Sequence, residues 1–154
     1  MRAQGSSEGL VKVLFSLQQD EDGYPPVASE SLWAKPTTEG LFELDNIPFY
    51  AQGVSWKDVV AAEPSVEGTF IFKKVVKPSG HSTIRVIAFK HDEMQPLQQE
   101  LERLGASWEG SDQPCLIAVD IPPAVDIQRV WDFLQAGMDE GRWDYEDAAI
   151  QHPQ

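Results

Sequence analysis

Apolar and polar residues alternate in short runs through the first half of the chain, most clearly in residues 41–60. Phe42 and Leu44 are separated there by an acidic residue, which is the period of two expected of a strand with one buried face. Asn46 and Pro48 then predict a tight corner, because an Asn side chain can satisfy turn backbone and a proline disfavours helix at the residue before it. Residues 41–60 are therefore predicted to form a strand, a corner and a second strand.

Similar runs, divided by Gly- and Pro-rich turns, predict five or six short strands in this half. Gly53 is expected to adopt a positive φ within one of the connections. Short strands with frequent turns are typical of a strongly bent sheet or a small barrel. The expected strands are 10–17, 30–35, 40–45, 54–63 and 68–76.

The apolar spacing changes near residue 82. Four apolar residues fall at helical spacing over 94–104 and stop at Gly105, where a helix end favours glycine. A second apolar stripe over 124–139 predicts another helix. Strands are expected at 83–89, 106–110 and 115–121, and 142–149 is either a last strand or the end of the second helix.

The resulting order of strand, helix, strand, strand, helix and last segment is typical of ferredoxin-like sheets. We expect an α+β fold in which a bent β-rich or small-barrel half packs on a ferredoxin-like (βαββαβ) half. The expected boundaries are a flexible tail at 1–9, a β-rich subdomain at 10–80, the ferredoxin-like subdomain at 81–150 and a second tail at 151–154.

Negative charge is concentrated in the second half. Residues 1–90 carry 11 acidic and 9 basic residues, a net charge of −2, whereas residues 91–154 carry 14 acidic and 3 basic residues, a net charge of −11. A field of this sign repels nucleic-acid phosphates and attracts a basic protein surface. The alternative is that the charge only keeps the protein soluble.

The composition also predicts a compartment. No run of about 18 apolar residues is present, and the amino-terminal segment lacks the apolar core of a secretory signal, so we expect neither a membrane span nor export. Cys115, the single cysteine, cannot form an internal disulfide and is predicted to be a small buried hydrophobe. A reducing cytoplasm is therefore the expected location.

Three residues, His81, Arg85 and Asp120, make up an alternative polar site. His81 begins the one His-x-Thr step of the chain, whereas phosphoester chemistry of this type would need two, and His152 lies in the predicted tail. Ser82 is adjacent to His81, so the two side chains would point to opposite faces of a strand and not form a nucleophile and base. Arg85 lies in an apolar strand and is expected to pair with Asp120, while His81 satisfies local hydrogen bonds in a turn.

No cofactor and no metal are predicted. Asp20, Glu21 and Asp22 are consecutive, whereas calcium loops need oxygen ligands at alternating positions over about twelve residues. Gly-rich phosphate loops, paired cysteines and nucleophile elbows are absent from the sequence.

Aromatic and acidic residues alternate near the carboxyl terminus, where such a strip could bind a basic partner. The alternative is a terminal strand with no partner. The candidate partner-binding residues are Asp139, Glu140, Trp143, Asp144, Tyr145, Glu146 and Asp147.

Four segments have a distinctive combination: DEDGYPP at 20–26, ESLWA at 30–34, LFELDNIPFYAQGVSWKDVV at 41–60 and SGHSTIRV at 79–86. Together they resemble the bacterial family known as domain of unknown function 4265, over roughly residues 10–120. The resemblance implies a small, bacterial, intracellular protein and brings no activity or catalytic residues. Small acidic proteins of this kind are often immunity partners of secreted toxins, which is an analogy of class.

The leading hypothesis is a non-enzymatic acidic protein of the immunity or antitoxin type, which neutralises a basic protein partner such as a nuclease toxin. The first alternative is a small-molecule-binding or regulatory module, because ferredoxin-like sheets often hold ligands between subunits. The second is an enzyme that uses His81 and Arg85, whose side chains would then converge in one cleft with nearby acids.

Overall fold

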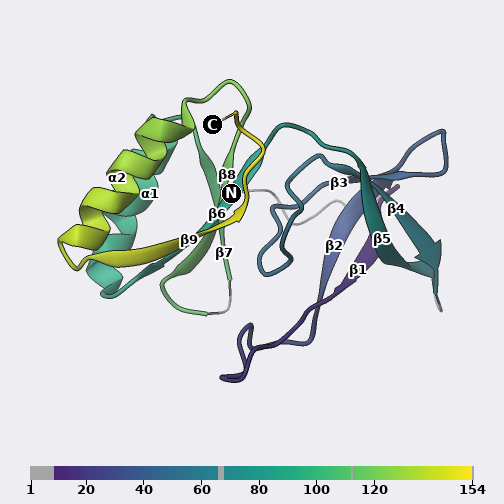
Figure 1. Cartoon of the computed structure of the whole chain (residues 1–154), viewed down its shortest axis with the longest axis horizontal. Coiled ribbons are helices and arrows are strands. Elements are labelled where there is room, and N and C mark those ends of the chain that lie inside the picture. The colour runs from purple at the N-terminus through teal and green to yellow at the C-terminus, as the bar shows by residue number, and fades with distance from the viewer. Residues whose placement is uncertain (1–8, 66–67, 112, 154) are drawn as a thin grey trace.

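Five strands of the first half close into a barrel, and a four-stranded sheet with two helices follows it in the computed structural model (Figure 1). The structure describes residues 9–65, 68–111 and 113–153. The barrel strands are β1 (Val11–Ser16), β2 (Ser29–Pro36), β3 (Phe42–Leu44), β4 (Val59–Pro64) and β5 (Thr69–Lys77). Consecutive strands pair antiparallel, and the parallel pair of β1 with β5 closes the barrel.

The apolar members of each alternating strand fill the barrel. Val13 and Phe15 of β1 and Leu44 of β3 are at most 4 % exposed. Phe15 also stacks on Phe72 of β5, with 4.4 Å between the ring centroids. Full burial of such a side chain stabilises the fold by about 1.5–3 kcal/mol. The apolar residues that alternate in the sequence therefore stabilise the closed barrel.

The second half forms one sheet with both helices on the face away from the barrel (Figure 1). In chain order its elements are β6 (Ser82–Ala88), a short 3-10 helix η2 (His91–Glu93), α1 (Met94–Arg103), β7 (Ser107–Gly110), β8 (Leu116–Ile121), α2 (Ile127–Asp139) and β9 (Trp143–Ala149). The strands lie in the order β7-β8-β6-β9, and all neighbours are antiparallel. Within the described ranges, no helix has the length and apolar character needed to cross a membrane.

The central strand β6 has two different faces. Ile84 and Val86 are fully buried in the core beneath the helices, together with Leu97 of α1. Thr83 and Arg85 point to the opposite face, because successive strand residues alternate. The barrel half covers that face, so these two polar residues are 0 % and 2 % exposed.

The predicted mixed α+β fold and the small barrel are confirmed. Segment 142–149, which the sequence left open, is the strand β9. The helix α2 begins at Ile127, later than predicted, because the Asp126 side chain accepts a hydrogen bond from the Gln128 backbone N–H and caps the helix there.

The predicted strand over 54–63 is wrong in its first five residues, because β4 begins at Val59. The Asp58 carboxylate accepts a hydrogen bond from the Ser55 backbone N–H at 2.9 Å, and Lys57 has a φ of 70°. Both features turn the chain instead of extending it. Gly53 has the predicted positive φ, at 77°.

Two further expectations fall near the ends of elements. Cys115, predicted to be buried in a strand, is partly exposed with a φ of 67° directly before β8. His152, which was predicted to lie in a terminal tail at 151–154, is instead 7 % exposed and hydrogen-bonded to Ser82. Residues 1–8 of the other predicted tail, and residue 154, lie outside the described residues.

Gly137 of α2 leaves the space that the Trp143 indole occupies. A Cβ atom at position 137 would lie 2.0 Å from the indole ring. The indole N–H donates a hydrogen bond to the Leu134 carbonyl at 2.9 Å, and Trp143 is fully buried. The helix and the edge strand β9 are thus wedged together at this point.

Replacing Gly137 with Ala should lower the free energy of unfolding by about 1–3 kcal/mol, because the new methyl group overpacks the indole. The usual effect of Gly→Ala inside a helix is a gain of about 1 kcal/mol, so the sign is diagnostic. Urea unfolding measures it. G110A in β7 is the control, since a Cβ there meets nothing within 4 Å. A G137A variant as stable as the wild type would contradict the wedge.

Candidate functional site

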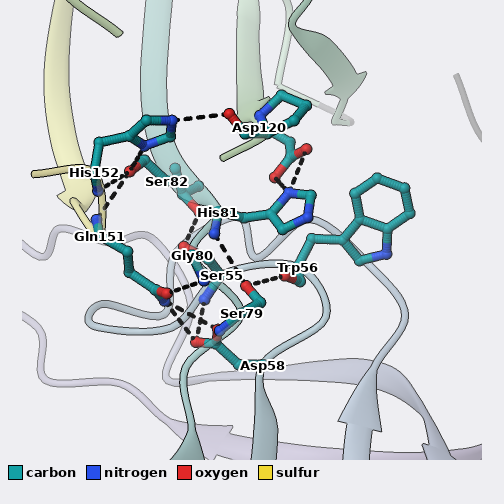
Figure 2. Close-up of polar contacts among 12 residues, drawn as sticks. Ser55, Trp56, Asp58, Ser79, Gly80, His81, Ser82, Asp120, Gln151 and His152 are labelled. Carbon is teal, nitrogen blue, oxygen red and sulfur yellow. Dashed lines mark hydrogen bonds and ion pairs between the residues drawn. The ribbon is translucent and has the colours of Figure 1, made fainter. Parts of the chain in front are cut away.

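Polar side chains gather where the barrel, the linker before β6 and the end of the chain meet (Figure 2). The junction cluster consists of Ser55, Asp58, Ser79, His81, Ser82, Asp120, Gln151 and His152. Asp58 is 0 % exposed, and its carboxylate accepts hydrogen bonds from the backbone N–H groups of Ser55 and Ser79 and from the Gln151 side-chain amide, at 2.8 to 3.1 Å. One buried carboxylate thus joins three segments that are far apart in sequence.

His81 and Asp120 form a buried pair within this cluster (Figure 2). His81 Nδ1 lies 3.0 and 3.1 Å from the two carboxylate oxygens of Asp120. Burial raises the pKa of Asp120 to about 7. Burial also lowers the pKa of His81, and the positive charge of Lys57 lowers it further. These two shifts oppose an ion pair and favour a single proton shared by the two side chains.

Ser82 and His152 lie at the distance of a nucleophile and its base, but they are not accessible. Ser82 Oγ is 2.6 Å from His152 Nδ1, and His152 Nε2 is 2.8 Å from the Pro122 carbonyl oxygen. Because a carbonyl only accepts, Nε2 of the neutral ring carries the proton and Nδ1 accepts from the serine hydroxyl. Ser82 is 0 % exposed and also accepts the backbone N–H groups of Gln151 and His152. This contact fastens the end of the chain to β6.

The predicted ion pair between Arg85 and Asp120 is wrong. Arg85 donates from Nε to Glu146 and from Nη1 to the Phe49 carbonyl, both at 2.8 Å. Strand register explains the choice, because Glu146 lies opposite Arg85 across β6 and β9, whereas Asp120 lies opposite Thr83. Arg85 Nη2 has no hydrogen-bond partner among the described residues, although the side chain is 2 % exposed.

A cavity of about 560 Å³ lies between the sheet and the loop that joins β1 to β2. Arg85 and Ile87 of β6 and Glu146 of β9 line its sheet side, and Tyr24 and Tyr50 line its barrel side. The two tyrosine rings meet edge to face, with 6.2 Å between centroids. We call this space the Arg85 cavity. Its volume is within the range of ligand sites, about 300–1,000 Å³.

Tyr24 closes the cavity against the sheet. Its hydroxyl donates a hydrogen bond to Glu146 at 3.3 Å. Burial raises the pKa of Tyr24, and the nearby positive charge of Arg85 opposes that effect. The phenol therefore stays protonated as a donor at neutral pH, and Glu146 is held from two sides, by Tyr24 and by Arg85.

Glu30 of β2 holds the barrel wall of the Arg85 cavity. Its carboxylate accepts hydrogen bonds from the backbone N–H groups of Phe49, Tyr50 and Ala51, at 2.6, 3.0 and 2.8 Å. These bonds position Tyr50 and also the Phe49 carbonyl that accepts from Arg85. Glu30 thereby fixes both the wall of the cavity and one contact between the halves.

The predicted polar site is therefore divided, because His81 and Asp120 lie in the junction cluster while Arg85 lines the cavity. Among the described residues, no group of three or more potential metal-ligating side chains gathers in one place. In the predicted acidic loop, the Asp20 carboxylate accepts the backbone N–H groups of Asp22 and Tyr24, as a turn residue does.

The seven candidate partner-binding residues do not share one environment. The prediction that Trp143 contacts a partner is corrected, since this side chain is 0 % exposed and packs in the core beneath the helices. Its position on β9 points to the helix side, opposite to Asp144. Glu140 bonds to Arg142, and Glu146 to Arg85.

Three of the candidates, Asp139, Asp144 and Asp147, are exposed and make no ion pair in the part of the chain that the structure describes. We call these three residues the acidic edge, because Asp144 and Asp147 lie on β9, an edge strand of the sheet, and Asp139 ends α2 just before that strand. They surround Tyr145, whose pKa is raised by burial and then by the charges of Asp147, Asp139 and Asp144. The sequence pattern thus located a real concentration of carboxylates.

Tyr24, Tyr50 and Glu30 were not identified as site residues from the sequence. Each lies in one of the four segments that carry the family resemblance, which was the available signal. The pairing of Arg85 with Glu146 had a weaker signal, a lone basic residue in an apolar strand and an acidic alternation in another. Deciding between Glu146 and Asp120 required the strand order.

Single substitutions in the His81–Asp120 pair should change stability with opposite pH dependences. In His81→Gln, the folded Asp120 keeps its proton up to about pH 7, while the unfolded carboxyl loses it near 3.8, so stability falls as pH rises between these values. In Asp120→Asn, the unfolded His81 binds a proton below about 6.5 that the folded ring does not, so stability falls as pH drops through that range. Urea unfolding at pH 5 to 8, taken as the difference from wild type, measures both slopes. Slopes of the same sign would contradict the shared proton.

Comparison with known proteins agrees with this fold and adds no activity. No curated protein matches the chain. A crystal structure of a hypothetical protein from Neisseria gonorrhoeae has a similar fold, with a TM-score of 0.76 and 20 % sequence identity over 92 % of this chain and 94 % of that chain. The model of the family described as Domain of unknown function (DUF4265) matches residues 30–145, which confirms the resemblance found in the sequence. The chain belongs to the DUF4265 family.

Proposed function

We propose that this protein is a non-enzymatic acidic binding protein of the immunity or antitoxin type, which docks on a basic protein partner in the bacterial cytoplasm and neutralises it. The acidic edge carries the proposal. Its three carboxylates are exposed, lie around one tyrosine and have no neutralising base among the described residues. A basic surface would be attracted to this edge.

The arginines of the second half do not cancel this field. Two of the three arginines in residues 91–154 are already paired, since Arg103 bonds to Glu100 and Arg142 bonds to Glu93 and Glu140. Residues 91–154 carry 14 acidic and 3 basic residues, so the basic residues are too few to neutralise the carboxylates of this segment. Long-range attraction of this kind speeds docking more than it tightens the final complex.

The arrangement of the second half supports the same location for a partner. We infer that this half is ferredoxin-like, since the order of its elements and the strand order β7-β8-β6-β9 match that pattern. The barrel covers the sheet face that lacks helices, so the helices and the strand edges remain for docking. Acidic side chains on β9 also discourage the addition of a foreign strand, which favours contact through side chains.

The test begins with the proteins encoded beside this gene, each coexpressed with it and purified at moderate salt. For a basic neighbour that copurifies one to one, neutralising Asp139, Asp144 and Asp147 to Asn should slow association by about tenfold at low salt. The difference should vanish in 500 mM NaCl, because the Debye length falls from about 10 Å at 0.1 M salt to about 3 Å at 1 M. Stopped-flow mixing measures the rates.

The matched control neutralises Glu21, Glu39 and Glu43 of the barrel half to Gln, which changes the net charge by the same amount. An equal loss of association rate in both triple variants would show that the effect depends on net charge and not on the acidic edge. A rate insensitive to salt between 50 and 500 mM would contradict the electrostatic mechanism.

A further inference from the structure

The Arg85 cavity has more negative than positive charge on its walls. Arg85 is already bonded to Glu146, and the two other carboxylates that line the cavity belong to Asp22 and Asp144. Neither makes an ion pair in the described ranges of the chain. An occupant with a positive charge would therefore be attracted, and a free anion would be repelled.

The barrel side of the cavity is aromatic. Tyr24 and Tyr50 line it with their rings edge to face, and Tyr24 is 39 % exposed. An ammonium or guanidinium group is attracted to an aromatic face within about 6 Å. Ile87, which is 44 % exposed at the same cavity, offers apolar surface to the methylene groups of such a side chain.

Arg85 limits where the positive charge of an occupant can lie. Its guanidinium repels a cation, so the positive group must lie near Asp22 or Asp144, away from Arg85. Arg85 Nη2 has no hydrogen-bond partner among the described residues, but this atom is itself buried and is not open to the occupant. A lysine or arginine side chain, with a cation at the end of a long apolar chain, matches the two carboxylates, the tyrosine rings and Ile87.

We propose that the Arg85 cavity binds a lysine or arginine side chain of a polypeptide partner, with the positive group of that side chain near Asp22 and Asp144. The inference rests on the proposed function, because it names what a basic partner places in this molecule. Asp144 belongs both to the acidic edge and to the cavity wall, so the two surfaces are continuous. A basic side chain attracted by the edge would meet the cavity beside it.

The probe is the blocked tripeptide acetyl-Gly-Arg-Gly-amide, titrated into the ¹⁵N-labelled full chain. We expect saturable shifts of the amide signals of Tyr24, Ile87 and Glu146. The neutral citrulline tripeptide, which keeps the shape but not the charge, should not produce them. Asp22→Asn and Asp144→Asn should each weaken binding about fivefold, as loss of about 1 kcal/mol does. Asp132→Asn on α2, outside both the cavity and the acidic edge, is the matched control and should leave the affinity unchanged.

Equal binding of the citrulline peptide, or shifts confined to the acidic edge, would overturn the inference. Tighter binding of free arginine than of the blocked peptide would overturn the polypeptide source and assign the cavity to a zwitterionic small molecule. Failure of the proposed function is distinguishable, since it would appear as the absence of any salt-dependent complex with a basic protein. If that complex forms and the tripeptide still leaves the cavity signals unmoved, only the cavity inference fails.

Discussion

The buried carboxylate of Asp58 determines how the two halves of the molecule sit on each other. Removing a carboxylate from water costs several kcal/mol, and here donors from Ser55, Ser79 and Gln151 offset that cost. Those donors lie in the barrel, in the linker and after the last strand. The Arg85 cavity has one wall from each half, so it persists only while this junction holds.

The strand β6 connects the junction to the Arg85 cavity and to the acidic edge. Its helix side is apolar and forms the core of the second half, while Thr83 and Arg85 on its other side bond to Ser55 and Phe49 of the barrel half. Glu30 then fixes the segment that holds the Phe49 carbonyl. Buried polar groups at such a contact must all find partners, so they specify one relative position of the halves. Two residues of the acidic edge lie on the neighbouring strand β9 and the third ends α2, and all three carboxylates are exposed to solvent.

Local patterns predicted most of the strands and helices, and long-range contacts explain where those predictions failed. Alternation at Phe42 and Leu44 marks a barrel strand because its buried face is a property of the strand itself. Residues 54–58 look extended but turn, because Asp58 bonds to a linker and a terminus that local spacing does not reveal. Arg85 pairs with Glu146 and not with Asp120 because the strand register places Glu146 opposite it. Trp143 is buried because Gly137 has no side chain and leaves space for the indole. The charge asymmetry could be read from the composition. The cavity could not be predicted, because its walls come from both halves of the folded protein.

Native-state hydrogen exchange, measured as a function of low urea concentrations, tests most directly whether the junction makes one body of the two halves. The amides of β1 in the barrel and of β6 in the sheet should open with a common free energy in the wild type. Asp58→Asn should lower the opening free energy of the β1 amides by about 2 kcal/mol or more, since hydrogen bonds to a charged group are lost, and should separate them from the β6 amides. Separate opening of the two halves already in the wild type, unchanged by Asp58→Asn, would contradict this account.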